Sequence, residues 1–353
     1  MREPDMTKVE ALVGKLVGDV GASLSAALIV LGDRLGLYKA MADGEPVNAG
    51  DLAKKTGLNE RYLREWLSAQ AAAGCIDYDA KAKRFSLSPE QAMAFADESS
   101  PAFFAGAFDI VQSVWLDEPR IEQAFRTGEG VGWHEHSACL FKGTERFFRP
   151  GYNANLVDSW IPALEGVRDK LEHGATVADV GCGHGSSTIL MAKAFLTAHF
   201  YGFDYHKASI ERARQAAKEA GVADRIVFEQ AAAKDFPDHD YDLVTMFDCL
   251  HDMGDPVGAG KHVKETLKPD GVWMVVEPYA NDALEDNLNP VGRIYYAAST
   301  MICTPASRSQ EVGLALGAQA GEGRLRSVME EAGFHHVRRA SETPFNLVFE
   351  ATA

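Results

Sequence analysis

Hydrophobic residues recur every three to four positions near the start of the chain, which is the spacing of one face of a helix. The pattern predicts two helices between Thr7 and Met41, broken near Gly18 to Gly21. Because few polar residues interrupt them, these helices need burial on more than one side, and a second subunit would supply it. The apolar run from Val20 to Gly32 is shorter than the roughly 20 residues that cross a bilayer. We therefore expect a packed helix, no membrane span, and a homodimer formed through this N-terminal region.

A compact series of short elements follows. Helical patterns over Asn48 to Thr56 and Asn59 to Ala73 precede two short strand patterns, Cys75 to Asp79 and Arg84 to Ser88. Helix, turn, helix and hairpin is the order of a winged helix, which binds DNA in many regulators and serves as a packing domain in others. The charges that open its second helix cancel, whereas a reader of the major groove would carry excess cations there. Nucleic acid is therefore a disfavoured partner.

Beyond His173 the pattern changes to short β-branched or aromatic runs that alternate with amphipathic helices. The strands read ATVADV, HFYGFD, IVFEQA, YDLVTMF, VWMVVEP, HHVRRA and FNLVFEA. This alternation predicts an α/β fold with a doubly wound, mostly parallel, seven-stranded sheet. We expect three parts: a helical and winged-helix dimerisation domain (1–100), a helical linker that lines a pocket (101–172), and the α/β domain (173–353) with an insertion at 281–319.

Composition and charge narrow the class of protein. The chain has 353 residues, 46% of them hydrophobic, and 35 Lys and Arg against 51 Asp and Glu give a net charge of −16. A net negative charge of this size repels the phosphate backbones of nucleic acids and anionic membranes. Five cysteines without a CxxC pair indicate reduced thiols, and the acidic, proline-containing N-terminus is unlike a signal peptide. These features predict a cytoplasmic globular protein.

The first strand and helix of the α/β domain meet at a glycine-rich loop. The loop runs from Asp179 to Gly185 and reads D-V-G-C-G-H-G, so that an acid precedes G-x-G-x-G. Glycines allow the backbone to pass close beneath a ligand, and the next helix offers its positive N-terminus. Asp204 ends the second strand, nineteen residues beyond Gly185, where a carboxylate can accept both hydroxyls of a ribose.

With these residues in place, the chain resembles class I S-adenosylmethionine-dependent methyltransferases, whose first motif is an acid followed by G-x-G-x-G. The resemblance covers much of 176–353 and implies a Rossmann-like methyltransferase fold with S-adenosyl-L-methionine as cofactor. The acid that holds the adenine in that family is replaced by Ala232, so Asp235 or the backbone of Ala233 and Lys234 takes that role, with Phe236 against the ring. The resemblance implies these cofactor-binding residues: Arg149, Asp179, Gly181, Cys182, Gly183, His184, Gly185, Asp204, Tyr205, Ala233, Lys234, Asp235, Phe236, Asp248 and Cys249.

The segment after the fourth strand is similar to the H-D-W-x-D segment of small-molecule O-methyltransferases. In those enzymes the histidine is the general base, which here is His251, and a carboxylate after the fifth strand orients it, which here is Glu277. The implied function is methyl transfer to a small, planar or aromatic acceptor, with oxygen favoured. N-, S- and C-methyl acceptors, a scaffold without transfer activity, and a DNA-binding regulator with a ligand-sensing methyltransferase-like domain remain as alternatives.

The acceptor pocket is expected to draw on the insertion and on the preceding linker. Trp133, Tyr295, Tyr296 and Met301 are the candidate walls, since flat apolar side chains suit a flat apolar acceptor. No metal is expected, because the His-x-His of the linker has no HExxH context and no third ligand.

Overall fold

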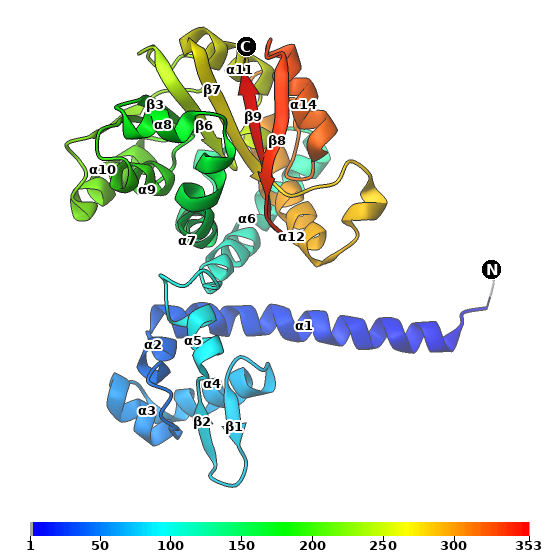
Figure 1. Ribbon diagram of the computed structural model, residues 1–353. Coiled ribbons are helices and arrows are strands. Elements are labelled where there is room, and N and C mark those ends of the chain that lie inside the picture. The colour runs from blue at the N-terminus through cyan, green and yellow to red at the C-terminus, as the bar shows by residue number, and fades with distance from the viewer. Residues whose placement is uncertain (1–2, 353) are drawn as a thin grey trace. The chain divides into compact units, whose positions relative to one another are not determined.

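The computed structural model describes residues 3–352. These residues form two compact units (Figure 1). The first contains the chain up to Trp115 together with Lys142–Pro150, and the second contains Leu116–Phe141 and the chain from Gly151 onward. The stretch predicted as a linker is thus divided between the two units.

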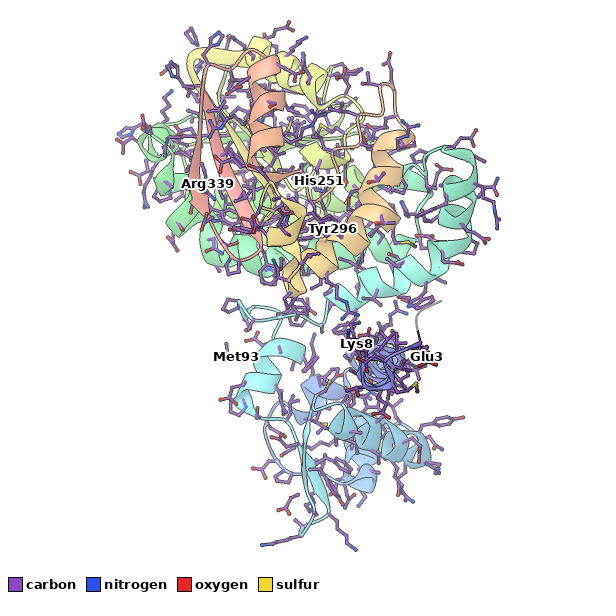
Figure 2. All side chains as sticks on the ribbon, turned by 90° about the vertical axis from the view of Figure 1, so that its right-hand side faces the viewer. Glu3, Lys8, Met93, His251, Tyr296 and Arg339 are labelled. Atoms are coloured by element: carbon purple, nitrogen blue, oxygen red, sulfur yellow. The ribbon has the colours of Figure 1, made fainter. Side chains whose placement is uncertain are left out.

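The first helix, α1 (Met6–Arg34), is continuous, so the predicted break near Gly18 to Gly21 is wrong. Glycine inside an exposed helix costs only about 1 kcal/mol relative to alanine, and the segment holds no proline to force a kink. Within the single chain only Ala26, Ile29, Val30 and Gly32 of this helix are buried, so burial of its other faces by a second subunit stays a prediction. Figure 2 looks along α1 and shows side chains projecting around it.

Among the described residues, α1 is also the one helix long and apolar enough to cross a membrane, with a mean hydropathy of 1.5 over its most apolar window and 17% of that window buried. Length and composition alone do not separate a membrane span from an exposed apolar helix of another kind. They therefore do not bear out the expectation that no span is present.

The rest of the first unit has the order of a winged helix. Asn59 caps the second helix of the motif through its side chain, as its sequence position indicates. A core built around Tyr38, Leu52, Trp66 and Leu67 holds the elements together. The elements are α2 (Leu37–Met41), α3 (Ala49–Thr56), α4 (Glu60–Ala72), β1 (Asp77–Asp79), β2 (Arg84–Ser86), α5 (Pro89–Phe95) and the start of α6 (Ala107–Thr127).

The second unit is built on a seven-stranded sheet in the order β5-β4-β3-β6-β7-β9-β8. The five strands from β5 to β7 are parallel, while β9 runs antiparallel to both β7 and β8. This confirms the predicted Rossmann-like methyltransferase fold with a mostly parallel sheet. The strands are β3 (Thr176–Val180), β4 (His199–Asp204), β5 (Ile226–Gln230), β6 (Tyr241–Phe247), β7 (Leu267–Pro278), β8 (His336–Glu342) and β9 (Asn346–Thr352).

Helices cover the apolar faces of this sheet. Leu325 and Met329 of α14 pack with Ala259 and Val263 of α11 over Trp273 and Val275 of β7. The carboxyl ends of the parallel strands meet at one edge, where open α/β sheets bind ligands. The helices of this unit are α8 (Val167–Glu172), α9 (Ser186–Ala194), α10 (Lys207–Ala220), α11 (Pro256–Thr266), α12 (Pro290–Ala298), α13 (Thr304–Arg308) and α14 (Gly321–Glu331), with short helical turns that include η1 (Trp133–Glu135) and η6 (Ser299–Cys303). The residues of α7 (Ala138–Asn155) are divided between the two units.

Candidate active site

The glycine loop follows β3, and its three glycines have positive φ for different reasons. A Cβ at Gly181 would lie 2.7 Å from the Cys249 sulfur, and one at Gly185 would lie 2.6 Å from the Phe228 ring. Packing therefore requires glycine at both positions. A Cβ at Gly183 would meet nothing within 4 Å, so the space above this residue is open. This open cradle is where a ligand can approach the backbone.

Asp179 is the penultimate residue of β3 and fixes the start of the next helix. Its buried carboxylate accepts hydrogen bonds from the hydroxyls of Ser187 (2.7 Å), Thr188 (2.6 Å) and Thr245 (3.2 Å). Burial raises the pKa of Asp179, and these three hydrogen bonds oppose that rise. The side chain predicted to bind the cofactor thus also joins β3, α9 and β6 beneath the loop.

Asp204 lies beside the same loop, at the end of β4. Its Oδ2 accepts the backbone N–H of Gly183 at 3.0 Å, and its Oδ1 accepts that of His206 at 2.8 Å. Burial raises the pKa of Asp204, whereas the two backbone hydrogen bonds lower it. Since each carboxylate oxygen can accept more than one hydrogen bond, Asp204 retains the capacity to hold a pair of hydroxyls.

The residues predicted around the adenine do not converge as expected. Phe236 is 1% exposed and stacks on Phe203 inside the core, so the expectation that it lies against the adenine is wrong. The Phe236 ring follows a polar turn and packs in the core, where large apolar side chains are usually buried. Lys234 forms ion pairs with Asp255 and Glu311, and Asp235 accepts the backbone N–H of Ala232.

The guanidinium of Arg149 is paired with two carboxylates. Arg149 belongs to the first unit, where this group pairs with Glu98 at 2.7 Å and with Glu145 at 3.2 Å. Its role toward the cofactor stays a prediction.

The histidine and glutamate expected to act together are in direct contact. His251 Nδ1 lies 2.5 Å from Glu277 Oε2, and Glu277 Oε1 accepts the backbone N–H of Leu250 at 2.9 Å. Both side chains are buried. Burial lowers the pKa of His251, but the carboxylates of Glu277 and Asp252 raise it more, so the imidazole remains charged well above its ordinary pH range. The dyad can hold a proton and release it as the pH rises.

This coupling gives a direct test of the dyad. The change Glu277→Gln keeps the shape and an oxygen for Leu250 but removes the negative charge that stabilises the imidazolium. We expect the pKa of His251 to fall in the variant, measured by NMR titration of the ring C–H signals. The exposed His199 serves as the internal control, with no change expected. A pKa of His251 that is the same in both proteins would contradict the electrostatic role of Glu277.

Asp248 and Cys249 precede this dyad and form a buried network. Asp248 has a positive φ of 50° and accepts hydrogen bonds from Tyr152 Oη (2.7 Å) and Asn346 Nδ2 (2.9 Å). The Cys249 thiol donates to the Val180 carbonyl at 3.3 Å, which links it to the glycine loop. Sequence reasoning missed Asn346, because a single asparagine at the start of the last strand carries no motif.

Cys303 is a second neighbour that the sequence did not single out. Donor atoms of His251, Asp252 and Cys303 lie within 4.8 Å of one another, a spacing that a thiophilic metal could use. Burial, together with the charge of Asp252, raises the pKa of the Cys303 thiol to about 12. The thiol therefore keeps its proton at neutral pH in the protein alone. The expectation of a metal-free site stays a prediction.

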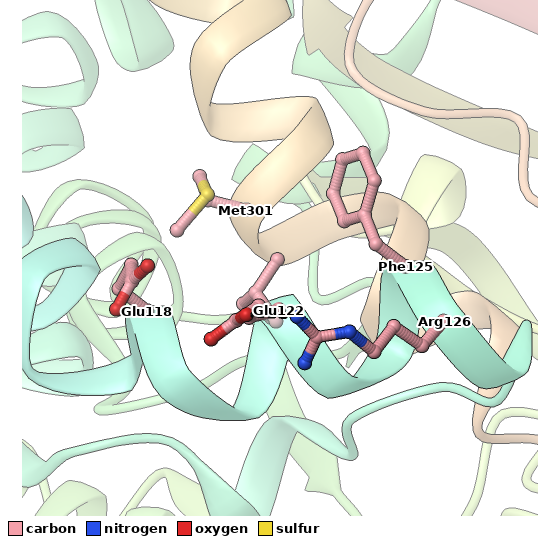
Figure 3. Close-up of a pocket in the computed structure, with 6 residues that line it drawn as sticks. Glu118, Glu122, Phe125, Arg126 and Met301 are labelled. Carbon is pink, nitrogen blue, oxygen red and sulfur yellow. Dashed lines mark hydrogen bonds and ion pairs between the residues drawn. The ribbon is translucent and has the colours of Figure 1, made fainter.

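The predicted acceptor-pocket residues occupy different surroundings. Tyr295 is buried, its hydroxyl donates to the Phe345 carbonyl at 2.8 Å, and the nearby charge of Asp248 adds to the effect of burial in raising its pKa. Trp133 meets the Phe141 ring edge-on. Tyr296 is half-buried on the same helix as Tyr295. Met301 instead lines a hollow of about 390 Å³ with residues of α6, among them Ile121 and Phe125 (Figure 3).

Comparisons with known proteins agree with this architecture. Residues 171–333 match the family model described as "Methyltransferase domain", and residues 22–96 match the "Rv2258c-like winged HTH domain". The chain thus combines a methyltransferase domain with an N-terminal winged helix-turn-helix domain. Its fold is that of mitomycin 7-O-methyltransferase, with 22% sequence identity and a TM-score of 0.67 over 98% of this chain and all of that one. It is also that of human N-acetylserotonin methyltransferase in complex with SAM, with 15% identity and a TM-score of 0.69 over 96% of this chain and 97% of that one.

Among curated proteins, the chain is 31% identical over 169 residues to 27-O-demethylrifamycin SV methyltransferase of Amycolatopsis mediterranei, which covers 46% of this chain and 57% of that protein. The chain spans about half the length of the curated relatives it matches. The match to each relative therefore concerns a part of that protein.

Proposed function

We propose that this protein is an S-adenosylmethionine-dependent methyltransferase that methylates an oxygen of a small, planar acceptor. The observation that carries the proposal is the buried dyad of His251 and Glu277, 2.5 Å apart at the carboxyl ends of β6 and β7. It is joined to the glycine loop through Cys249, whose thiol donates to Val180 at the end of β3. A general base beside a nucleotide cradle is the arrangement that methyl transfer to a hydroxyl needs.

The residues present fit the cofactor. Gly183 leaves open space above the loop, and Asp204 offers carboxylate oxygens at its side. When bound, S-adenosylmethionine supplies an electrophilic methyl group on a sulfonium. In transfer to an acceptor hydroxyl, His251 would take the hydroxyl proton at Nε2. Glu277 holds Nδ1–H throughout and stabilises the imidazolium that forms.

The high pKa of His251 implies that the base is charged in the resting protein. The rate of transfer should therefore rise with pH as the imidazolium deprotonates. Exclusion of water by an acceptor adds to the burial that lowers this pKa.

The experiment that tests the proposal is a transfer assay with methyl-labelled S-adenosylmethionine against a panel of phenols, hydroxyquinones and hydroxyindoles. The panel follows two solved neighbours, which are methyltransferases of mitomycin and of N-acetylserotonin. A labelled product that keeps its methyl group under conditions that hydrolyse esters and thioesters would support a methyl ether, and so methylation on oxygen. Transfer found only to nitrogen, sulfur or carbon would overturn the oxygen assignment.

The open space over Gly183 gives a prediction that separates ligand binding from folding. Alanine at this positive-φ position is expected to cost about 1–2 kcal/mol of unfolding free energy. It should also weaken the binding of S-adenosylhomocysteine at least ~10-fold, because a methyl group intrudes on the ligand. Gly221→Ala is the matched control, since Gly221 also has a positive φ and open space but ends α10. Equal affinities in the two variants would contradict the cradle.

We further propose that the chain forms a homodimer through α1 and acts in the cytoplasm. Leu12, Leu16, Val20 and Leu24 are each about half or more exposed along one helix, which is more apolar surface than a lone soluble chain usually presents. The Lys15–Asp19 ion pair lies midway along the helix, where charges disfavour a bilayer. A second copy offers the same stripe and closes the contact by symmetry.

The dimer predicts a clear change in mass. Light scattering on a sizing column should give twice 38.3 kDa for the native chain, and one copy for the double variant Leu16→Glu with Val20→Glu. Lys8→Glu changes a charge elsewhere on α1 and should leave the dimer intact. A native monomer, or flotation of the native chain with phosphatidylcholine vesicles, would contradict this use of α1.

The DNA-binding alternative has little support from the winged helix. Arg61 and Arg64 of α4 are paired with Glu65 and Glu60 at 2.5 and 2.8 Å, so their charges are not free for phosphate or base contacts. Specific retention of genomic fragments in a mobility-shift assay at low salt would favour the regulator instead.

A further inference from the structure

Three different donor atoms meet beside the catalytic dyad. A ring nitrogen of His251, a carboxylate oxygen of Asp252 and the sulfur of Cys303 all lie within 4.8 Å of one another. His251 and Asp252 belong to the turn η4 (Leu250–Asp252), and Cys303 ends η6. Imidazole, carboxylate and thiolate are the ligands that proteins use for Zn²⁺, and in a tetrahedral site they lie about 3.3–3.8 Å apart. The three atoms are thus close enough to bind one ion after small side-chain movements.

The contact with Glu277 determines which nitrogen of His251 faces this cluster. Glu277 Oε2 lies 2.5 Å from Nδ1, so Nδ1 is occupied, and Nε2 is the nitrogen that lies 3.2 Å from Asp252 Oδ1. Glu277 is itself held by the backbone N–H of Leu250. A carboxylate on the outer nitrogen is the arrangement that orients histidine ligands in metal sites and makes them more basic. The dyad therefore prepares His251 to bind a cation as well as a proton.

Asp252 offers a carboxylate oxygen that the fold leaves without a partner. In the part of the chain that the structure describes, its Oδ1 is buried and forms no hydrogen bond, although His251 Nε2 is only 3.2 Å away. A buried acceptor of this kind costs free energy unless a ligand supplies its partner. The Asp252 side chain as a whole is 20% exposed, against 5% for His251, so Asp252 is the ligand at which a cation reaches the cluster from water.

The backbone around the cluster is held in place by hydrogen bonds. The Ser307 hydroxyl donates to the Met253 carbonyl at 2.7 Å, and Gln310 Nε2 donates to the Asp252 carbonyl at 2.9 Å. Ser307 belongs to α13, which begins directly after Cys303. These bonds connect the segment that carries the thiol to the turn that carries the other two ligands. The ligands are therefore near one another before a cation arrives, which favours binding.

We propose that His251 Nε2, Asp252 and Cys303 Sγ form an inhibitory site for a thiophilic divalent cation, represented by Zn²⁺, with water as the fourth ligand. Binding releases the proton at His251 Nε2 and the thiol proton of Cys303 to solvent, and no group is oxidised or reduced. The cation then occupies the lone pair that would take the acceptor's proton. Methyl transfer proceeds in the cation-free protein and stops when the site is filled. The inhibition rests on the proposed function, whereas the binding of the cation does not.

Binding is tested on the full chain with Co²⁺, which takes the place of Zn²⁺ and absorbs in the near ultraviolet when a thiolate is bound to it. We expect one Co²⁺ per chain with this absorption, displaced by Zn²⁺ and not by Mg²⁺, which prefers oxygen ligands. Cys303→Ser should abolish the absorption. Cys75→Ser is the matched control and should keep it, since Cys75 is a partly buried cysteine of the first unit. Glu277→Gln should weaken Zn²⁺ binding by ~10–100-fold, the usual effect of losing the outer partner of a histidine ligand.

Three results would overturn the site: no thiolate absorption in the native protein, an absorption that persists in Cys303→Ser, or Mg²⁺ that competes as well as Zn²⁺. Should Cys303→Ser unfold, NMR of the native protein decides. One equivalent of Zn²⁺ must shift the ¹⁵N signal of His251 Nε2 and leave the signals of the exposed His199 in place. An unchanged His251 signal would overturn the site as well.

Inhibition is measured separately, with the methyl-transfer assay in a chelator and in buffered Zn²⁺. Transfer should proceed in the chelator, fall at least ~100-fold when Zn²⁺ saturates the site, as on loss of a general base, and return when chelator is added again. Transfer that is unaffected by saturating Zn²⁺, or that is lost in the chelator, would overturn the inhibition. No transfer under any condition, with Co²⁺ binding intact, would instead defeat the proposed function.

Discussion

Replacement of His251 by alanine is expected to slow methyl transfer by ~100-fold or more, the usual effect of losing a general base. Cofactor affinity should change little, because the dyad contacts the glycine loop only indirectly through Cys249. The loss should fall on kcat, since the base acts as the oxygen attacks. Single-turnover transfer with labelled cofactor measures it.

The controls for this prediction distinguish chemistry from folding. His199→Ala removes an exposed imidazole at the start of β4 and should leave the rate unchanged. Thermal unfolding of His251→Ala shows whether Glu277, left buried without its partner, destabilises the unit. A folded His251→Ala protein with native turnover would remove His251 from the role of base.

The second large effect is expected at Asp204. Its carboxylate is the group placed to hold the ribose hydroxyls, and a hydrogen bond to a charged group contributes about 1.5–3 kcal/mol. Asp204→Ala should therefore lower the affinity for S-adenosylhomocysteine by ~100-fold or more, if both hydroxyls lose their partner. Asp204→Asn keeps one acceptor oxygen and should lie between the native and alanine proteins.

A matched carboxylate is available for comparison. Asp270 is exposed in the first part of β7, away from the carboxyl ends of the strands, and forms an ion pair with Lys170 at 2.7 Å. Asp270→Ala should bind as the native protein does. Native affinity in a folded Asp204→Ala protein would show that the ribose is held elsewhere.

The parallel sheet and its edge could be predicted because local patterns and topology agree. Asp179, the glycine loop and Asp204 follow adjacent strands, so a parallel sheet brings them to one edge whatever else the chain does. The contact of His251 with Glu277 follows in the same way from the adjacency of β6 and β7. The spacing of motifs is therefore sufficient to predict which residues meet, where those residues lie at the ends of adjacent strands.

The remaining differences arise where tertiary packing decides. Phe236 follows a polar turn and could face a ligand or the core, and its contacts with Phe203 and His262 place it in the core. The continuity of α1 across Gly18 and Gly21 depends on small differences in helix propensity. His136 and Asp117 are nineteen residues apart with no motif between them, so only the fold brings them together.

The measurement that tests the central claim most directly is calorimetric titration of the native chain with S-adenosylmethionine and S-adenosylhomocysteine. We predict micromolar binding of both at one molecule per chain, and loss of that binding in Asp204→Ala but not in Asp270→Ala. No binding of either compound by the native, folded protein would contradict the account.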